Sequence, residues 1–132
     1  MPDSPFMLSR ILLVEDHQID VLIQTKFLQQ LKIAEQIDVS PNGKEAWAYL
    51  QACAQKGSYP DLILLDIQMP VMDGLQFLAL LAQSEQSYLI PQRVILLTSS
   101  LDEHEFAQAR QYQVRGIITK PITAEKIRRL FS

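Results

Sequence analysis

Four short apolar runs, each ending at a polar or charged residue, constrain the fold of this chain most strongly. The runs are Ile11–Val14 before Glu15 and Asp16, Leu62–Leu65 before Asp66, Val94–Leu97 before Thr98, and Gly116–Thr119 before Lys120. Continuous apolar runs of this length are typical of central strands in a parallel sheet, because those strands are buried on both faces. Ligands of open α/β sheets bind outside the carboxyl ends of the strands. We therefore expect the acids, the hydroxyl and the lysine to share one crevice.

Helical periodicity separates the apolar runs. The predicted inner positions are Ile19, Leu22, Ile23, Phe27 and Leu31 in a first helix, Ala46, Trp47, Leu50 and Ala54 in a second, and Leu75, Leu78, Leu81 and Ala82 in a third. A weaker helix is expected over 102–112, and Thr123 is expected to cap a last one. Ile37 and Val39 predict a short strand near an edge of the sheet, and residues 84–92 are expected to form a polar loop.

Strands that alternate with helices five times predict a three-layer α/β domain with a five-stranded parallel sheet. A chain of 132 residues, 48% of them hydrophobic, suits one domain with one substantial core. We expect residues 1–132 to form that single domain, with 1–9 as a short N-terminal extension.

Charge and hydropathy exclude several classes of protein. A net charge of -3 and the lack of a basic stripe longer than Lys126, Arg128 and Arg129 argue against direct nucleic-acid binding. The apolar stretches are far shorter than the ~20 residues that span a bilayer, and the N-terminus has no apolar signal core. Cys53 is the only cysteine, so no intramolecular disulfide can form, and its alanine neighbours predict a small buried side chain. We expect a cytoplasmic protein without a membrane partner.

The acids at the strand ends require a cation. If Glu15, Asp16 and Asp66 lie ~4 Å apart, each ionised pair repels by about 4 kcal/mol at an effective dielectric of 20. Carboxylates without cysteine ligands favour a hard, oxygen-seeking ion, and two or three carboxylates plus water suit Mg²⁺. The sequence therefore predicts a partly hydrated Mg²⁺ at this edge of the sheet.

A carboxylate beside such an ion can attack phosphorus and form an aspartyl phosphate. We assign Asp66 as the nucleophile, Lys120 as the phosphate-binding cation and Thr98 as a hydroxyl donor to a phosphoryl oxygen. Ser99 or Ser100 could donate in place of Thr98. Asp20 is interpreted as a first-turn acid favoured by the helix dipole, and Asp73 as a helix N-cap.

These segments resemble the receiver domains of two-component response regulators. The residues that carry the resemblance are LLVEDH, LILLDIQMPVMDG, VILLTSS and ITKPIT, in the family's order and at its usual separations. The resemblance implies that Asp66 is the phosphoacceptor, that Glu15 and Asp16 are the acid pair, and that Gln68 adds a backbone carbonyl to the metal site. It also implies a cis Lys120-Pro121 bond and a flavodoxin-like strand order of 2-1-3-4-5.

By the same resemblance, the partners are a histidine kinase or phosphotransfer protein and a downstream protein target. The contact face would comprise the helix over 102–112, the strand at Ile117 and Ile118, and the last helix, which could also support a weak homodimer; otherwise the protein is a monomer. We expect a stand-alone receiver that assists its own phosphorylation but turns over no external substrate.

One departure from the family keeps an alternative open. Ile117 stands three residues before the lysine, where the family has an aromatic switch residue, so a binding module that no longer depends on phosphate is the second hypothesis. A phosphatase or a flavin-binding protein fits less well. The phosphatase would need an acid at Gln68, and the flavin protein would need phosphate-binding residues in place of Glu15 and Asp16.

Overall fold

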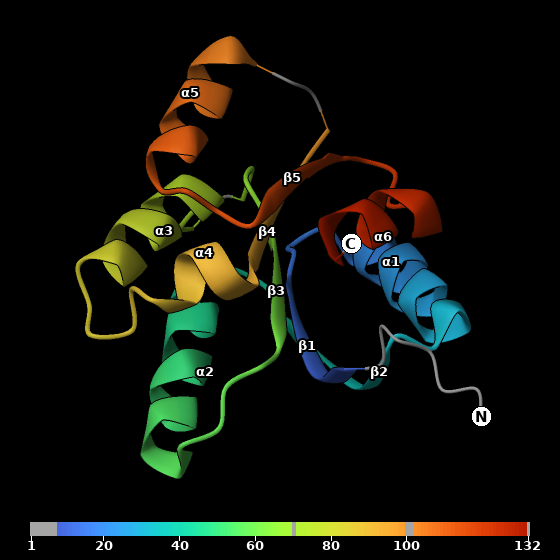
Figure 1. Ribbon diagram of the computed structural model, residues 1–132, viewed down its shortest axis with the longest axis horizontal. Coiled ribbons are helices and arrows are strands. Elements are labelled where there is room, and N and C mark those ends of the chain that lie inside the picture. The colour runs from blue at the N-terminus through green and yellow to red at the C-terminus, as the bar shows by residue number, and fades with distance from the viewer. Residues whose placement is uncertain (1–7, 70, 100–101, 132) are drawn as a thin grey trace.

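A parallel sheet forms the centre of the molecule (Figure 1). The computed structural model describes residues 8–69, 71–99 and 102–131. The strands are β1 (Leu8–Val14), β2 (Ala34–Ser40), β3 (Leu62–Asp66), β4 (Val94–Thr98) and β5 (Gly116–Thr119). Their order is β2-β1-β3-β4-β5, and all four neighbouring pairs are parallel. The predicted flavodoxin-like sheet is confirmed, with β2 at an edge as expected.

Helices cover both faces of the sheet (Figure 1). One face carries α1 (Gln18–Leu31) and α6 (Ala124–Phe131), and the other carries α2 (Gly43–Lys56), α3 (Gly74–Ala82), α4 (Leu89–Arg93) and α5 (Glu103–Gln111). Successive strand residues alternate between two apolar cores because side chains alternate across a strand. Leu12 and Val14 pack with α2 and α3, whereas Ile11 and Leu13 pack with Leu28 of α1.

Polar caps place the helices that follow the strand ends. Asn42 accepts a hydrogen bond from the backbone N–H of Glu45 at the start of α2. Asp73 forms a capping box with Gln76 at the start of α3, which confirms its predicted role. The Thr123 hydroxyl accepts from the N–H of Lys126, as expected for the last helix.

The inner face predicted for α1 is wrong over its first half. Ile19, Leu22 and Ile23 are 63%, 57% and 59% exposed, and the buried residues of α1 are Gln24 and Leu28. Gln24 donates a hydrogen bond to Glu15, and this contact turns polar residues of α1 toward the end of the sheet. The apolar residues are left facing outward. Ala54 and Ala82, expected on the inner faces of α2 and α3, are also exposed, because Cys53 and Leu81 complete those faces.

Two boundaries also differ from expectation. The segment predicted as a loop over 84–92 contains α4, whose Leu89 and Ile90 are buried. Pro91 is tolerated there because the first turn of a helix needs no bond from that N–H. β1 begins at Leu8, so residues 8 and 9 belong to the strand rather than to the N-terminal extension. That residues 1–132 form one stand-alone domain stays a prediction.

Cys53 is buried and unpaired, as predicted. Within the described ranges, the helices lack the combination of length and apolar character that crossing a lipid bilayer requires.

Candidate phosphoacceptor and metal site

The predicted site residues converge at the carboxyl ends of the strands. Asp66 and Thr98 are the last residues of β3 and β4, Glu15 and Asp16 follow β1, and Lys120 follows β5. The Lys120-Pro121 peptide bond is cis, as the resemblance implied. One oxygen each of Glu15, Asp16 and Asp66 lies within 4.8 Å of the others, an arrangement that could hold a metal ion. The acids and the lysine expected to meet at this edge of the sheet therefore do lie together.

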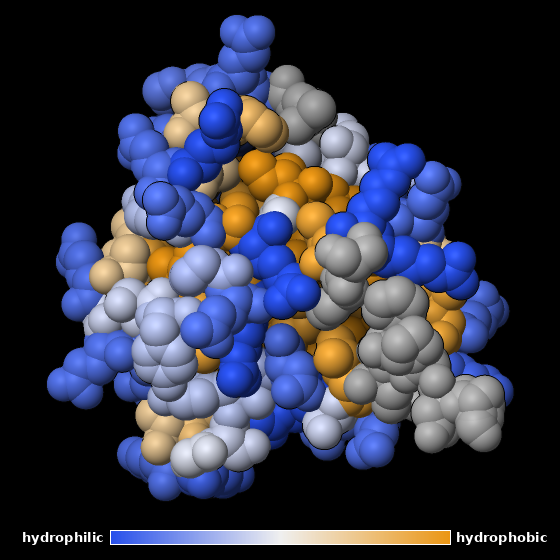
Figure 2. Space-filling view, in the orientation of Figure 1, coloured by the Kyte–Doolittle hydropathy of each residue, from blue (hydrophilic) through white to orange (hydrophobic). Residues whose placement is uncertain are grey.

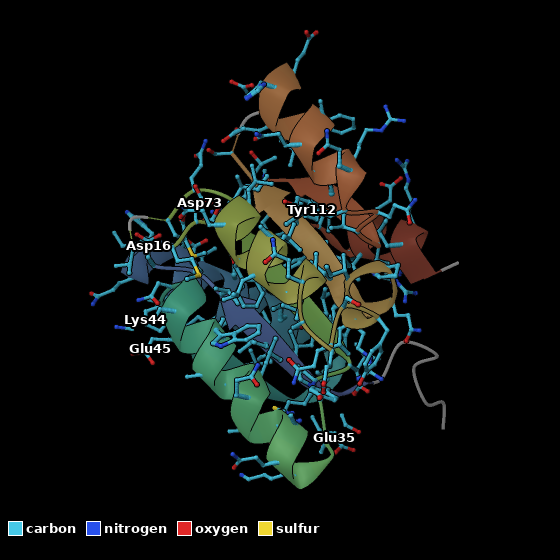
Figure 3. All side chains as sticks on the ribbon, turned by 90° about the vertical axis from the view of Figure 1, so that its left-hand side faces the viewer. Asp16, Glu35, Lys44, Glu45, Asp73 and Tyr112 are labelled. Atoms are coloured by element: carbon cyan, nitrogen blue, oxygen red, sulfur yellow. The ribbon has the colours of Figure 1, made fainter. Side chains whose placement is uncertain are left out.

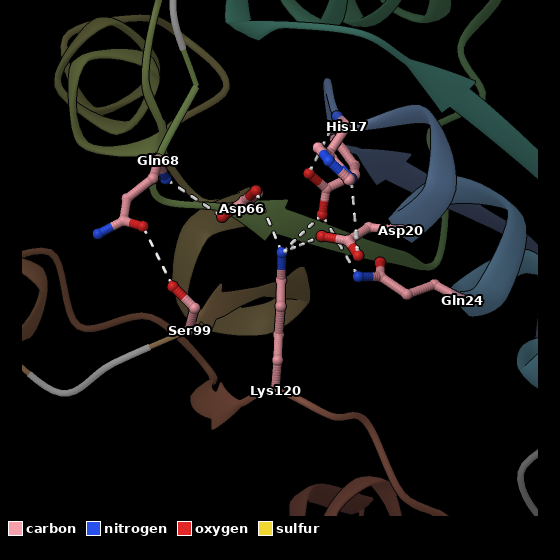
Figure 4. A network of polar contacts seen from close by, with 8 residues as sticks. His17, Asp20, Gln24, Asp66, Gln68, Ser99 and Lys120 are labelled. Atoms are coloured by element: carbon pink, nitrogen blue, oxygen red, sulfur yellow. Dashed lines mark hydrogen bonds and ion pairs between the residues drawn. The ribbon is translucent and has the colours of Figure 1, made fainter.

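Lys120 joins the acids of this crevice. Its Nζ lies 2.8 Å from Glu15 Oε1, 3.3 Å from Asp66 Oδ2 and 3.4 Å from Asp20 Oδ2. Figure 4 shows the lysine rising from the segment after β5 with Asp66 and Asp20 on either side of its ammonium group. A lysine is a compact charge with three donors, so it can serve three carboxylates at once.

Backbone and side-chain donors hold the two buried carboxylates. Glu15, 1% exposed, accepts from the backbone N–H of His17 and from Gln24 Nε2. Asp66, 5% exposed, accepts from the backbone N–H of Gln68 at 3.1 Å. Because a buried charge is costly unless it is hydrogen-bonded and paired, these contacts are what allow the acids to remain in the fold.

Gly74 lets α3 approach the segment that carries Asp66. The N–H of Gly74 donates to the carbonyl oxygen of Ile67 at 2.9 Å. A Cβ atom at position 74 would lie 2.6 Å from the Asp66 carbonyl oxygen and 2.9 Å from the Ile67 Cα. Both atoms belong to the backbone, so a larger residue would displace the nucleophile. The tight spacing makes glycine necessary at the start of α3.

The pKa values of the two buried acids, Asp66 and Glu15, shift in opposite directions. Burial raises the pKa of Asp66 to about 7, and the neighbouring Glu15 adds to the rise, although Lys120 opposes it. Burial also acts to raise the pKa of Glu15, but hydrogen bonds with Asp66 and Lys120 outweigh it and lower that pKa. Desolvation lowers the pKa of Lys120, whereas its contacts with Glu15 and Asp66 outweigh this and raise it. Without a further cation, the pair of acids favours a single negative charge.

Thr98 is 2% exposed at the end of β4, and its carbonyl oxygen accepts from the backbone N–H of Lys120 at 2.8 Å. The side chain of Gln68 accepts a hydrogen bond from the Ser99 hydroxyl at 3.2 Å. Ser99 is exposed, whereas Ser100 lies outside the described residues. The roles of Thr98 as the phosphoryl donor and of the Gln68 carbonyl as a metal ligand stay predictions.

The sequence interpretation missed two members of the site. Asp20 does lie in the first turn of α1, but it also contacts Lys120, and Gln24 is a buried partner of Glu15. Both residues face the strand ends because they occupy neighbouring turns of the same helix, at i and i+4. Asp16, Asp20 and Gln24 follow one another at intervals of four residues, and this spacing was the one sign in the sequence that Asp20 and Gln24 share a helix face. The apolar residues between Asp20 and Gln24 favoured a different inner face.

Comparisons with known proteins agree with this geometry. Residues 11–132 match the family model of the response regulator receiver domain. Response regulator Rcp1 of Synechocystis is 34% identical over 115 residues, which are 83% of this chain and 75% of that protein. A two component response regulator from Cytophaga hutchinsonii has a TM-score of 0.85 at 28% identity, over 95% of both chains. The Mn²⁺-bound form of Rcp1 has a TM-score of 0.72 at 30% identity, over 92% of this chain and 88% of that one.

Proposed function

The chain belongs to the response regulator receiver domain family, and we propose that it accepts a phosphoryl group on Asp66 in a Mg²⁺-dependent reaction. The observation that carries the proposal is the contact of Lys120 Nζ with Asp66 Oδ2 at 3.3 Å, beside two further acids. A cation and a carboxylate nucleophile at the same strand ends are what phosphoryl transfer to an aspartate requires.

The donor atoms of the site fit a hard divalent ion. Glu15, Asp16 and Asp66 offer carboxylate oxygens, and Gln68 would add a backbone carbonyl. The related Rcp1 has a Mn²⁺-bound form, which supports a divalent ion at these acids. A divalent cation bound here neutralises charge that spreads over the transferring phosphoryl oxygens. Oxygen ligands with no cysteine or histidine among them favour Mg²⁺.

In the transfer itself, ionised Asp66 attacks the phosphorus of a phosphohistidine. The new bond joins Asp66 Oδ to phosphorus, and the bond between phosphorus and the histidine nitrogen breaks, leaving its electron pair on the imidazole. Lys120 already lies beside Asp66 and binds a phosphoryl oxygen, and the Thr98 hydroxyl donates to another. The product is an aspartyl phosphate on a residue that is buried in the resting protein.

Receiver domains interact with histidine kinases or phosphotransfer proteins, and we propose that such a donor approaches over α1. Ile19, Leu22 and Ile23 are exposed on this helix. A cavity of about 510 Å³ continues from them toward the site, lined by Ile23 and Phe27 of α1, by Pro121 and Ile122, and by Asp20 and Lys120. An apolar helix face beside the phosphoacceptor suits a helix that presents a histidine to Asp66.

The downstream target would bind a different face, formed by α5, β5 and α6. Figure 2 shows apolar side chains gathered between α5 and α6 around β5. Val114 and Ile117 are partly buried there, and Phe106 of α5 is 37% exposed. A weak homodimer through the same face is compatible with this arrangement.

We propose no turnover of an external substrate and no direct contact with nucleic acid. The buried, unpaired Cys53 suits a reducing compartment such as the cytoplasm.

A phosphate-independent binding module is the second candidate, because Ile117 occupies the position of the family's aromatic switch. Its side chain is partly buried against the core cluster to which Leu96 and Ala109 belong. The two candidates differ in the response to beryllofluoride, which mimics an acyl phosphate. NMR shifts around Thr98 and Ile117 in the presence of Mg²⁺ support phosphate signalling, and unchanged spectra support the second candidate.

Phosphotransfer from candidate kinases tests the proposal. We expect the wild-type protein to be labelled in Mg²⁺ and not in excess chelator, and Asp66→Asn to remain unlabelled. Asp73→Asn is the matched control, because Asp73 caps α3 without joining the acid group and asparagine is also a good N-cap. Equal labelling of the wild-type protein and Asp66→Asn would show that the nucleophile is assigned wrongly.

A further inference from the structure

Asp20 is a fourth carboxylate at the site, and its contacts differ from those of the other three. Its Oδ2 lies 3.4 Å from Lys120 Nζ, whereas it does not belong to the group of Glu15, Asp16 and Asp66 whose ligand atoms lie within 4.8 Å of one another. Among the described residues, three acids offer oxygens to a common point, and two of them, Glu15 and Asp66, also contact Lys120. Asp20 contacts the lysine without joining that group.

The Asp20 side chain is partly exposed to solvent, and each of its two oxygens has a neighbour in the protein. The side chain is 39% exposed, compared with 17% for Lys120 and 1% for Glu15. Its second oxygen, Oδ1, lies 3.7 Å from His17 Nδ1. In Figure 4, Asp20 comes from α1 and lies on the opposite side of the lysine ammonium from Asp66. Its charge thus attracts Lys120 away from the phosphoacceptor and toward the donor side of the crevice.

We propose that Asp20 is a positioning residue that holds the Lys120 ammonium near α1 and competes with incoming phosphoryl oxygens for it. This inference rests on the proposed function of Asp66 and concerns a residue to which that function assigns no part. When a phosphoryl group enters, Lys120 exchanges its contact with Asp20 for one with a phosphoryl oxygen. The negative charge of Asp20 also repels the anionic donor. Both effects weaken donor binding, so Asp20 limits how readily small phosphodonors load the site.

Neutralising Asp20 should therefore strengthen donor binding. In Asp20→Asn, we expect the acetyl phosphate concentration that gives half-maximal labelling at saturating Mg²⁺ to fall about two- to fivefold, the range of a partly exposed ion pair. The difference should shrink as salt is added, because exposed charges are screened. Asp20→Glu should restore the wild-type value. Glu35→Gln is the charge-matched control, since Glu35 is exposed at the far end of the sheet from Asp16 (Figure 3).

A second measurement follows the lysine itself. In metal-free protein with ¹⁵N-labelled lysine, the ammonium resonance of Lys120 should shift in Asp20→Asn and stay unchanged in Glu35→Gln. If Asp20 merely stabilised the first turn of α1, Asp20→Asn would lower the melting temperature without changing this resonance or the acetyl phosphate dependence. Either unchanged readout overturns the inference. Labelling of Asp66→Asn would instead overturn the proposed function. The Lys120 resonance would still show whether Asp20 contacts the lysine, because that measurement needs no phosphorylation.

Discussion

Asp66 is buried beside Glu15, and this contact has a consequence for stability. The pKa of Asp66 rises from 3.8 to about 7 in the folded protein, so the folded state binds its proton more tightly than the unfolded chain does. The stability of the metal-free protein should therefore fall as pH rises from about 4 to about 7. Lys120 offsets part of the loss, because it pairs with the carboxylates as they ionise.

Asp66→Asn should remove that pH dependence. We expect the free energy of unfolding of the metal-free variant at pH 8 to exceed that of wild type by roughly 1–4 kcal/mol. Two like charges ~4 Å apart repel by about 1 kcal/mol in water and by about 4 kcal/mol at an effective dielectric of 20. At pH 4 the two proteins should differ little. Urea unfolding in chelator at both pH values measures this. A wild-type protein whose stability is the same at pH 4 and pH 8 would contradict the assigned environment of Asp66.

Gly74 offers a second test at a single position. Gly74→Ala should destabilise the protein by about 1–3 kcal/mol, because its Cβ would overlap backbone atoms of Asp66 and Ile67. Labelling should fall even at temperatures where the variant is fully folded. Gly116→Ala is the control, since its Cβ meets only side-chain atoms of Leu130 among its nearest neighbours. If both variants lose labelling in proportion to stability, Gly74 does not position the nucleophile.

Helix α1 joins the site to the exposed apolar face that we assign to the phosphodonor. Leu22→Asp should reduce phosphotransfer from a histidine-bearing protein about tenfold, the loss of one apolar anchor worth ~1.4 kcal/mol. Labelling by acetyl phosphate and the melting temperature should change little, because Leu22 is 57% exposed. Gln29→Asp adds the same charge at an exposed position farther along the helix. An equal loss with acetyl phosphate would place the defect in the site instead.

The same helix shows where sequence reasoning stops. The strands β1, β3 and β4 were predictable because a run buried on both faces has to be apolar throughout. The rotation of α1 was not, because it depends on Gln24 bonding Glu15, and on the contact of Asp20 with Lys120, 100 residues away in sequence. Apolar spacing alone favours the wrong face. Similarly, α4 could not be predicted, because its two buried residues, Leu89 and Ile90, are too few to show a helical period.

The fold as a whole explains why the site residues could be predicted better than some helices. A parallel sheet brings its carboxyl ends to one edge, so residues that follow separate strands meet whatever the helices do. Glu15, Asp66 and Lys120 meet for this reason. Asp20 and Gln24 join from a helix, and their contribution depends on packing that the strand pattern does not contain.

Mg²⁺ should stabilise the folded protein, because the three grouped acids exist as a group only in that state. We expect the melting temperature to rise with Mg²⁺ concentration, and the rise to be smaller in Asp16→Asn. Glu35→Gln should behave like wild type. A melting temperature that does not respond to Mg²⁺, or responds equally in Asp16→Asn, would contradict the assignment of the ion to these acids.

Locating the phosphoryl group on the chain tests the assignment of Asp66 most directly. The protein is labelled by acetyl phosphate in Mg²⁺, the acyl phosphate is reduced with borohydride, and mass spectrometry finds the residue converted to homoserine. We predict conversion at Asp66, dependent on the divalent ion. Conversion at another acid, or at Asp66 to the same extent in excess chelator, would contradict the account.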